Sequence, residues 1–329
     1  MARNRSPQNP VTQDDIDTYA RDGAVVLRGV CNQDWIEALA PIAHRIAAGR
    51  EDFGLLPSYP GRYMARVIPE FRELAFDGPL AEAACRVMQS KEAHFFFDEM
   101  FAKGPQSEEK TIWHTDRMGW PVSGKMVPSL WMPLTKITKR NCLEVIAGSH
   151  VQDVRYWLFS PNARKMVRPP DRVSHPDCEP LRQDPSVRFL TWDMEPGDLL
   201  IVHPWTLHYS GGNPEPFWRI AVSVRLFGDD IRWDPRPDCV NLAGISFDEM
   251  IPGERPAGPL CPLVWSEDGR RDDADAHFPR GFATTWTRER RANINEYDVF
   301  AANLAAVQRE AAAAKAAAGG KDAGVATAN

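Results

Sequence analysis

The sequence predicts a mainly β protein with flanking helices, and three segments carry that prediction. Residues 92–101 form an aromatic and apolar run, residues 199–208 open with an apolar run, and residues 217–227 alternate with a period of two. In the last segment, one predicted face is apolar. The opposite face carries Arg219, Ala221, Ser223, Arg225 and Phe227. The small residues beside Arg219 leave room for another group.

Helices are predicted before the first long strand. Apolar residues keep helical spacing there, Gly23 is suited to end one helix, and Asn32 is suited to begin the next. The predicted helices cover residues 13–21, a segment from Asn32 to about Gly49, and a helix pair at 71–90.

Strands alternate with turn sequences over most of the remaining chain. Pro196-Gly197 fits a type II turn before a strand that begins at Asp198. The other predicted strands cover residues 24–30, 92–101, 128–134, 143–147 and 217–227. Residues 151–190 form a long basic, aromatic and Pro-rich insertion, which favours a lid or a substrate-binding loop.

The predicted domain organisation is one domain over residues 1–300. Its core covers about residues 12–228, and residues 231–300, with many Pro and Gly, form loops and short helices that wrap the core or lie at a subunit contact. Residues 301–329 are predicted to form an Ala-rich helix and a disordered tail.

Composition favours a soluble protein that acts on a small molecule. The formal net charge is −6 and there is no long block of like charge, so neither nucleic acid nor an anionic membrane is an expected partner. The six cysteines form no Cys-x-x-Cys pair, which argues against a zinc site or a disulfide framework. No apolar run approaches the roughly 20 residues of a membrane span, and the N-terminus lacks a signal sequence, so the expected location is cytoplasmic. The sequence leaves open whether the chain forms a homo-oligomer.

His114 and Asp116 are the first candidates for a metal site. In a strand they would project to one face, about 6.6 Å apart along the backbone. His203 and His208 both could supply a third ligand. Two histidines and one carboxylate with open positions suit non-heme Fe(II). His-x-Asp triplets also arise by chance, so the alternative is a pair of surface or core residues without a metal.

The chain resembles the phytanoyl-CoA dioxygenase family of Fe(II)- and 2-oxoglutarate-dependent oxygenases. The resemblance covers about residues 12–228 and rests on three segments: 113–116, 141–150, and 195–210 followed by Arg219. Two departures are Arg140-Asn141, where many members have Asn-Gly, and Ala147, where many have Pro. Asn tolerates a left-handed turn well, so neither departure threatens the fold.

Residue by residue, the resemblance implies a set of roles. His114, Asp116 and His208 correspond to the iron ligands, which favours His208 over His203. Arg219 and Ser210 correspond to the residues that hold the far carboxylate of 2-oxoglutarate, and Trp131 falls at a tryptophan of the cosubstrate pocket. Asp116 also argues against halogenation, because related halogenases have a small residue there.

The expected fold is therefore a double-stranded β-helix, a cupin-like jelly roll, with helices against one sheet. The expected activity is that of a dioxygenase that uses Fe(II), 2-oxoglutarate and O2 to hydroxylate or otherwise oxidise an unactivated C–H bond of a small organic molecule. Succinate and CO2 are the expected coproducts. Arg117 and Trp120 follow the His-x-Asp triplet and are the substrate-facing candidates; alternatively, Trp120 only plugs the mouth of the barrel.

Two other functions compete with this interpretation. A jelly-roll metal enzyme that does not use 2-oxoglutarate would use the same ligands, but Arg219 would then form a structural ion pair. A non-catalytic ligand-binding member would hold no metal.

Overall fold

Two antiparallel β-sheets form the body of the protein. The computed structural model describes residues 2–50, 61–152, 154–156, 173, 177–235, 250–258 and 261–273. The six-stranded main sheet has the order β1 (Ala24–Leu27), β8 (Leu199–Val202), β5 (Ser129–Pro133), β10 (Arg219–Phe227), β2 (Glu92–Lys103), β12 (Leu263–Ser266). The four-stranded minor sheet has the order β3 (Thr111–His114), β9 (His208–Ser210), β6 (Leu143–Ile146), β7 (Phe189–Leu190). A small third sheet pairs β11 (Arg232–Trp233) with β4 (Val122–Ser123).

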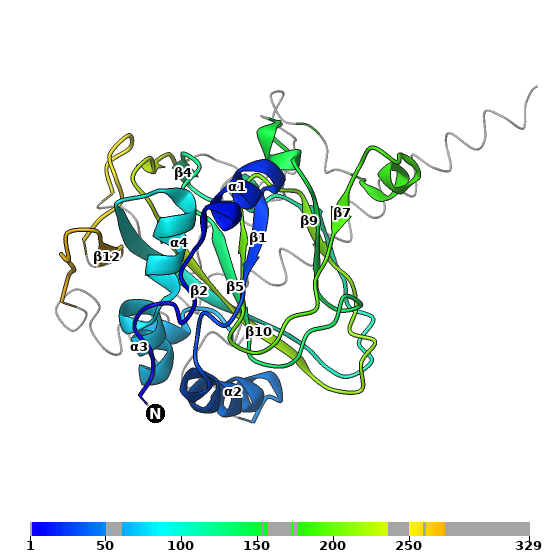
Figure 1. The fold of residues 1–329 in the computed structure, drawn as a ribbon, viewed down its shortest axis with the longest axis horizontal. Helices are drawn as coiled ribbons and strands as arrows, with labels where there is room; N and C mark the ends of the chain where they lie inside the picture. The colour runs from blue at the N-terminus through cyan, green and yellow to red at the C-terminus, as the bar shows by residue number, and fades with distance from the viewer. Residues whose placement is uncertain are drawn as a thin grey trace, which may run out of the picture.

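The two larger sheets face each other as the halves of a jelly roll, which confirms the predicted fold class. A buried apolar cluster lies between them and contains Trp131 of β5, Val145 of β6, Leu200 of β8 and Ala221 of β10. Figure 1 shows β9 and β7 on one side of β1, β5 and β10, with α3 and α4 on the other side. The sheets therefore enclose an interior lined by the inward-pointing half of each strand.

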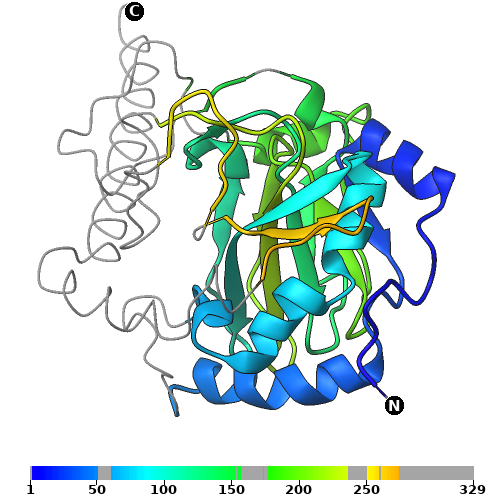
Figure 2. The same cartoon turned by 90° about the vertical axis from the view of Figure 1, so that its left-hand side faces the viewer.

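Helices cover the outer face of the main sheet (Figure 2). They are α1 (Gln13–Asp22), α2 (Gln33–Ala47), α3 (Pro69–Asp77) and α4 (Leu80–Met88). Trp35 and Leu39 of α2 and Phe71 of α3 are buried in the same cluster as the outward-pointing residues of β10. Short 3-10 helices complete the described elements: η1 (Met64–Arg66), η2 (Asp116–Met118), η3 (Ser149–Val151) and η4 (Glu179–Gln183).

Strand β10 has the two faces that its sequence pattern predicts. Ile220, Val222, Val224 and Leu226 lie in the cluster under the helices, whereas Ala221 lies in the cluster between the sheets. Because side chains alternate along a strand, Arg219, Ser223 and Arg225 point to the same interior as Ala221. All three are buried, at 1%, 0% and 4% exposure.

Several sequence-based boundaries need correction. Strand β1 ends at Leu27 instead of residue 30. Asn32 is the N-cap residue of α2, as predicted, but its side chain makes no cap bond and donates to the Ala2 carbonyl at 2.8 Å. Part of the insertion folds as η4 and β7, which pairs with β6. Residues 263–266, predicted as loop or short helix, form an edge strand paired with β2. The Ala-rich helix and tail predicted at 301–329 lie outside the described residues.

No helix in the described ranges is both long and apolar enough to cross a lipid bilayer.

Gly23 and Gly49 form a matched pair for testing how α1 joins the sheet. Gly23 ends α1 at φ 75°, and a Cβ there would lie 2.5 Å from His150 Nδ1, whereas a Cβ on Gly49, at φ 64°, meets no described residue within 4 Å. We expect Gly49→Ala to lower the free energy of unfolding by about 1–2 kcal/mol for the left-handed backbone alone. Gly23→Ala should cost about 1–3 kcal/mol more because of steric overlap. Urea denaturation measures both, and equal losses would contradict this packing.

Candidate active site

The pairing of β3 with β9 brings two histidines together. His114 and His208 are directly opposite each other in this antiparallel ladder, and their ring centroids lie 4.1 Å apart. Each ring presents Nδ1 to the carbonyl oxygen two residues earlier, Ile112 O at 2.7 Å and Thr206 O at 3.0 Å. Because an Nδ1–H group must donate these bonds, both Nε2 atoms keep their lone pairs available as ligands.

Asp116 lies near the histidines, but it belongs to a 3-10 helix and not to the strand that the sequence pattern predicted. Strand β3 ends at His114, and Asp116 begins the 3-10 helix η2, so the two side chains do not share a strand face. The turn is fixed from outside, since the backbone N–H of Arg117 donates to Pro204 O at 2.9 Å. Asp116 Oδ1 nevertheless lies 3.7 Å from Nε2 of both His114 and His208.

Among the described residues, these three side chains form a cluster that could hold a metal ion. One ligand atom from each of His114, Asp116 and His208 lies within 4.8 Å of the others. His203 lies elsewhere, packed against the rings of Tyr19 and His150 at 5.9 and 4.8 Å, and burial lowers its pKa to about 3. His208 rather than His203 therefore lies with the pair.

The carboxyl group of Asp116 is oriented by the main sheet. Ser129 Oγ of β5 donates a short hydrogen bond to Asp116 Oδ2, which leaves Oδ1 to face the histidines. Burial acts to raise the pKa of Asp116, but His208, Arg225 and His114 outweigh it, so the pKa lies below its usual value. Asp116 is thus held as a carboxylate with one oxygen directed at the histidines.

Arg219 at the start of β10 is a buried cation. The residue is 1% exposed, and its Nε and Nη2 atoms have no hydrogen-bond partner among the described residues. Its guanidinium lies 5.0 Å from the ring centroid of Trp131, and burial lowers its pKa to about 10. Because a buried unpaired donor is costly, this site is suited to an anionic group with two oxygens.

Lys103 is a second cation beside Arg219, and no sequence pattern indicated it. It lies directly opposite Arg219 in the pairing of β2 with β10. Its Nζ donates to Ser210 Oγ at 3.1 Å and to Gly211 O at 2.6 Å, and so ties β2 to the end of β9. Burial, followed by the charge of Arg219, lowers the pKa of Lys103 to about 8. A lysine at a strand end carries no distinctive sequence signal, and only the strand register reveals this pairing.

The two substrate-facing candidates lie in different surroundings. Arg117 lines a pocket beside η2, with its guanidinium 3.9 Å from the Trp205 ring centroid. Trp120 is 5% exposed and packs edge-on against Phe96 and Phe97, with centroids 6.1 Å away in each case. Trp120 is not among the described residues that line the pocket, whereas Trp205 is.

A jelly roll with a His-Asp-His cluster inside it defines a class, the non-heme iron oxygenases, because this donor set suits Fe(II) and leaves positions open. The buried guanidinium of Arg219, whose Nε and Nη2 atoms have no hydrogen-bond partner in the described part of the chain, fits a carboxylate cosubstrate in the same interior. The family model described as phytanoyl-CoA dioxygenase (PhyH) matches residues 19–221. The chain therefore belongs to the phytanoyl-CoA dioxygenase family. Family membership and the triad confirm the predicted enzyme class, an Fe(II)- and 2-oxoglutarate-dependent dioxygenase with O2 as the oxidant.

Individual relatives are distant. A probable phytanoyl-CoA dioxygenase of Caenorhabditis elegans is 30% identical over 102 residues, which cover 31% of this chain and 30% of that protein. Less than a third of that curated relative is therefore matched.

Solved structures share the fold. The non-heme alpha-ketoglutarate-dependent carbocyclase SnoK from nogalamycin biosynthesis superposes with a TM-score of 0.60 at 20% identity, covering 80% of this chain and all (100%) of that one. EctD from S. alaskensis, solved with 2-oxoglutarate and 5-hydroxyectoine, gives 0.57 at 19% identity, covering 78% and 93%. These likenesses support the jelly-roll fold.

Ser129 offers a test of how Asp116 is oriented. We expect Ser129→Ala to weaken Fe(II) binding about 10- to 100-fold, because the Asp116 carboxylate loses the bond that fixes its rotation. Anaerobic equilibrium dialysis measures this, and Ser129→Thr, which keeps the hydroxyl, should restore most of the affinity. Ser223→Ala is the matched control, since Ser223 Oγ is buried without a described partner. Unchanged affinity in Ser129→Ala would contradict the orienting role.

Proposed function

We propose that this protein hydroxylates an unactivated C–H bond of a small organic molecule. The substrate and O2 would be consumed with one 2-oxoglutarate, and the products would be the alcohol, succinate and CO2. One oxygen atom enters the substrate and the other enters succinate, so the four electrons that O2 accepts come equally from the C–H bond and from decarboxylation.

In this proposal His114 Nε2, Asp116 Oδ1 and His208 Nε2 bind the iron. The backbone carbonyls at Ile112 and Thr206 hold the two rings in the tautomer that binding requires. Bound iron, with 2-oxoglutarate and O2, supplies the oxidation of the C–H bond. The role of the protein is to hold the three ligand atoms on one side of the iron and to leave the other side open to cosubstrate and substrate.

Arg219 would hold the far carboxylate of 2-oxoglutarate. A guanidinium can fork a carboxylate with two parallel N–H···O bonds, and Arg219 has two buried nitrogens without a described partner. The Trp131 ring beside its guanidinium restricts where the fork can point. Ser210 Oγ, held by Lys103, would complete the carboxylate site, and Lys103 would add positive charge.

The proposed function depends on one observation: among the described residues, no carboxylate forms an ion pair with Arg219. In a jelly-roll metal enzyme that does not use 2-oxoglutarate, a buried arginine would be expected to pair with a carboxylate of the protein. Arg225, six residues further along β10, has such a partner in Glu99, with Nη1 and Oε2 3.1 Å apart, although its Nε and Nη1 atoms make no hydrogen bond among the described residues. No described carboxylate forms an ion pair with Arg219 within 4.0 Å. This contrast favours the 2-oxoglutarate-dependent function.

Arg219→Met tests the cosubstrate role and the cost of the buried charge together. Succinate formation from 2-oxoglutarate with Fe(II) should fall by about 100-fold or more, because two charge-assisted hydrogen bonds are lost. The ligand-free variant should melt at the same or a higher temperature than the parent, by about 2–4 °C for each kcal/mol of desolvation relieved. 2-Oxoglutarate should raise the melting temperature of the parent only.

Arg219→Lys, which keeps the charge without the fork, should be intermediate in succinate formation. Wild-type turnover in Arg219→Met would remove Arg219 from this role. No Fe(II)-dependent succinate from the parent protein would contradict the dioxygenase function itself.

Lys103 makes 2-oxoglutarate binding depend on pH. Its pKa, about 8 in the folded protein, lies below the ordinary 10.5, so the charge is lost as pH rises through about 8. We expect the affinity for 2-oxoglutarate to weaken about 3- to 10-fold between pH 7 and pH 9 as the positive charge beside Arg219 disappears. The same shift means that the free energy of unfolding of the ligand-free protein rises between about pH 8 and 10.5.

Calorimetric titration of 2-oxoglutarate into the Mn(II)-loaded protein measures this dependence. Lys103→Met should bind weakly at pH 7 and show a flat profile over this range. Lys136→Met is the control, because the Lys136 side chain is 63% exposed and pairs only with Glu195, at the surface. A profile in Lys103→Met as steep as that of the parent would contradict the role of this lysine.

A further inference from the structure

A pocket adjoins the candidate iron ligands and has its own chemistry. Thr115 and Met118, on either side of Asp116, form its inner wall, and Val154, Tyr156 and Trp205 form its apolar sides. Three charged residues complete the lining: Arg117, Arg155 and Asp234. Thr115 directly precedes Asp116, and Met118 belongs to the same short helix, so the pocket adjoins the segment that carries this candidate ligand.

The charge of this pocket is opposite to that of the whole chain. Among the described residues, two arginines and one aspartate line it, and Lys125 adds a further cation, with Nζ 5.4 Å from the Trp205 ring centroid. The chain as a whole carries a formal charge of −6. A local excess of positive charge in an acidic protein favours an anionic ligand and repels cations.

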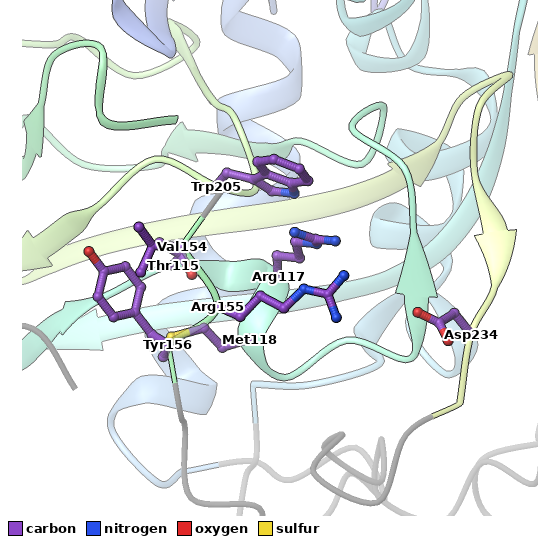
Figure 3. Close-up of a pocket in the computed structure, with 8 residues that line it drawn as sticks. All are labelled: Thr115, Arg117, Met118, Val154, Arg155, Tyr156, Trp205 and Asp234. Atoms are coloured by element: carbon purple, nitrogen blue, oxygen red, sulfur yellow. The ribbon is translucent and has the colours of Figure 1, made fainter. Parts of the chain in front are cut away.

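The donors in the pocket converge. In Figure 3 the guanidinium ends of Arg117 and Arg155 both point into the space between Trp205 and Asp234. The Arg117 guanidinium stacks on the Trp205 ring, with its central carbon 3.9 Å from the ring centroid, and the Arg117 backbone is fixed by its bond to Pro204 O. The indole Nε1–H of Trp205 is buried and has no hydrogen-bond partner among the described residues. An oxyanion placed here would meet donors from two guanidinium groups.

We propose that this pocket binds the organic substrate through an oxyanion, a carboxylate or a phosphate, with an apolar or aromatic body against Trp205, Tyr156 and Met118. Arg155 and Arg117 hold the anion, and the body extends toward Asp116. The substrate is thus oriented by its charge, with the bond to be oxidised on the metal side. This assignment rests on the proposed function only for calling the bound molecule a substrate.

Matched ligands test the assignment without iron or 2-oxoglutarate. The probes are naphthalene-2-carboxylate and 2-naphthyl phosphate, with naphthalene-2-carboxamide as the neutral analogue and 2-naphthylmethylamine as the cation. Quenching of tryptophan fluorescence in the full-length, metal-free chain reports binding, and the variants below locate it, because the chain has 11 tryptophans. We expect one or both anions to bind at least about tenfold more tightly than the amide, with the preference falling as salt rises. The tighter of the two anions then identifies which oxyanion the pocket prefers.

Three variants test whether this pocket causes the tighter binding of the anions relative to the amide. Arg155→Met should reduce the anion-to-amide ratio to below about threefold. Arg219→Met should keep the full ratio, which excludes binding of the probe at the cosubstrate cation. Arg140→Met is the matched surface control, because Arg140 is 67% exposed and pairs with Glu215.

Three outcomes would overturn the assignment: the amide or the amine binding as tightly as the anions, an unchanged ratio in Arg155→Met, or no binding of either anion. Because these measurements use neither metal nor cosubstrate, they remain decisive even if succinate formation fails in the parent protein. Conversely, failure of anion binding leaves the Arg219 experiment standing.

Discussion

The register between β3 and β9 is the constraint on which the site depends. It places His114 opposite His208, and the backbone carbonyls of the same two segments fix their tautomers. A slip of one residue would turn one of the rings to the opposite face of the minor sheet. The third group, Asp116, comes from outside the ladder and is held by Ser129 of the main sheet. The cluster therefore requires both sheets to be in place at once.

The inner face of β10 holds two buried cations in different ways. Arg225 lies near the rings of Phe97 and Trp120 and pairs with Glu99, which also accepts from Arg62 at 2.7 Å. Arg219 lies against Trp131, and Lys103 lies opposite it on the neighbouring strand β2, so two positive charges are side by side there. Breaking or omitting one partner of a buried pair is costly. The interior thus holds one compensated charge and one site that a dianionic cosubstrate would compensate.

Much of this architecture could be predicted from periodicity alone. The alternation over residues 217–227 assigned Arg219 to the inner face, and the cap signals at Gly23 located the end of α1. The bend at Asp116 could not be predicted, because it depends on a backbone bond to Pro204, far away in the chain. The position of Lys103 could not be predicted for a similar reason. It lies opposite Arg219 because of the strand register, which cannot be read from a single sequence. Short local patterns thus predicted which face a residue occupies, but not which distant residue it meets.

The central claim is that one ion and one diacid share the interior, the ion on His114, Asp116 and His208 and the diacid on Arg219. Anaerobic absorption spectroscopy tests this most directly, because a 2-oxo acid chelated to Fe(II) gives a visible charge-transfer band. The account predicts a band that requires both Fe(II) and 2-oxoglutarate, saturates at one equivalent of iron, and is absent in His208→Ala but present in His203→Ala. A band that survives in His208→Ala, or no band in the parent protein at saturating iron and cosubstrate, would contradict it.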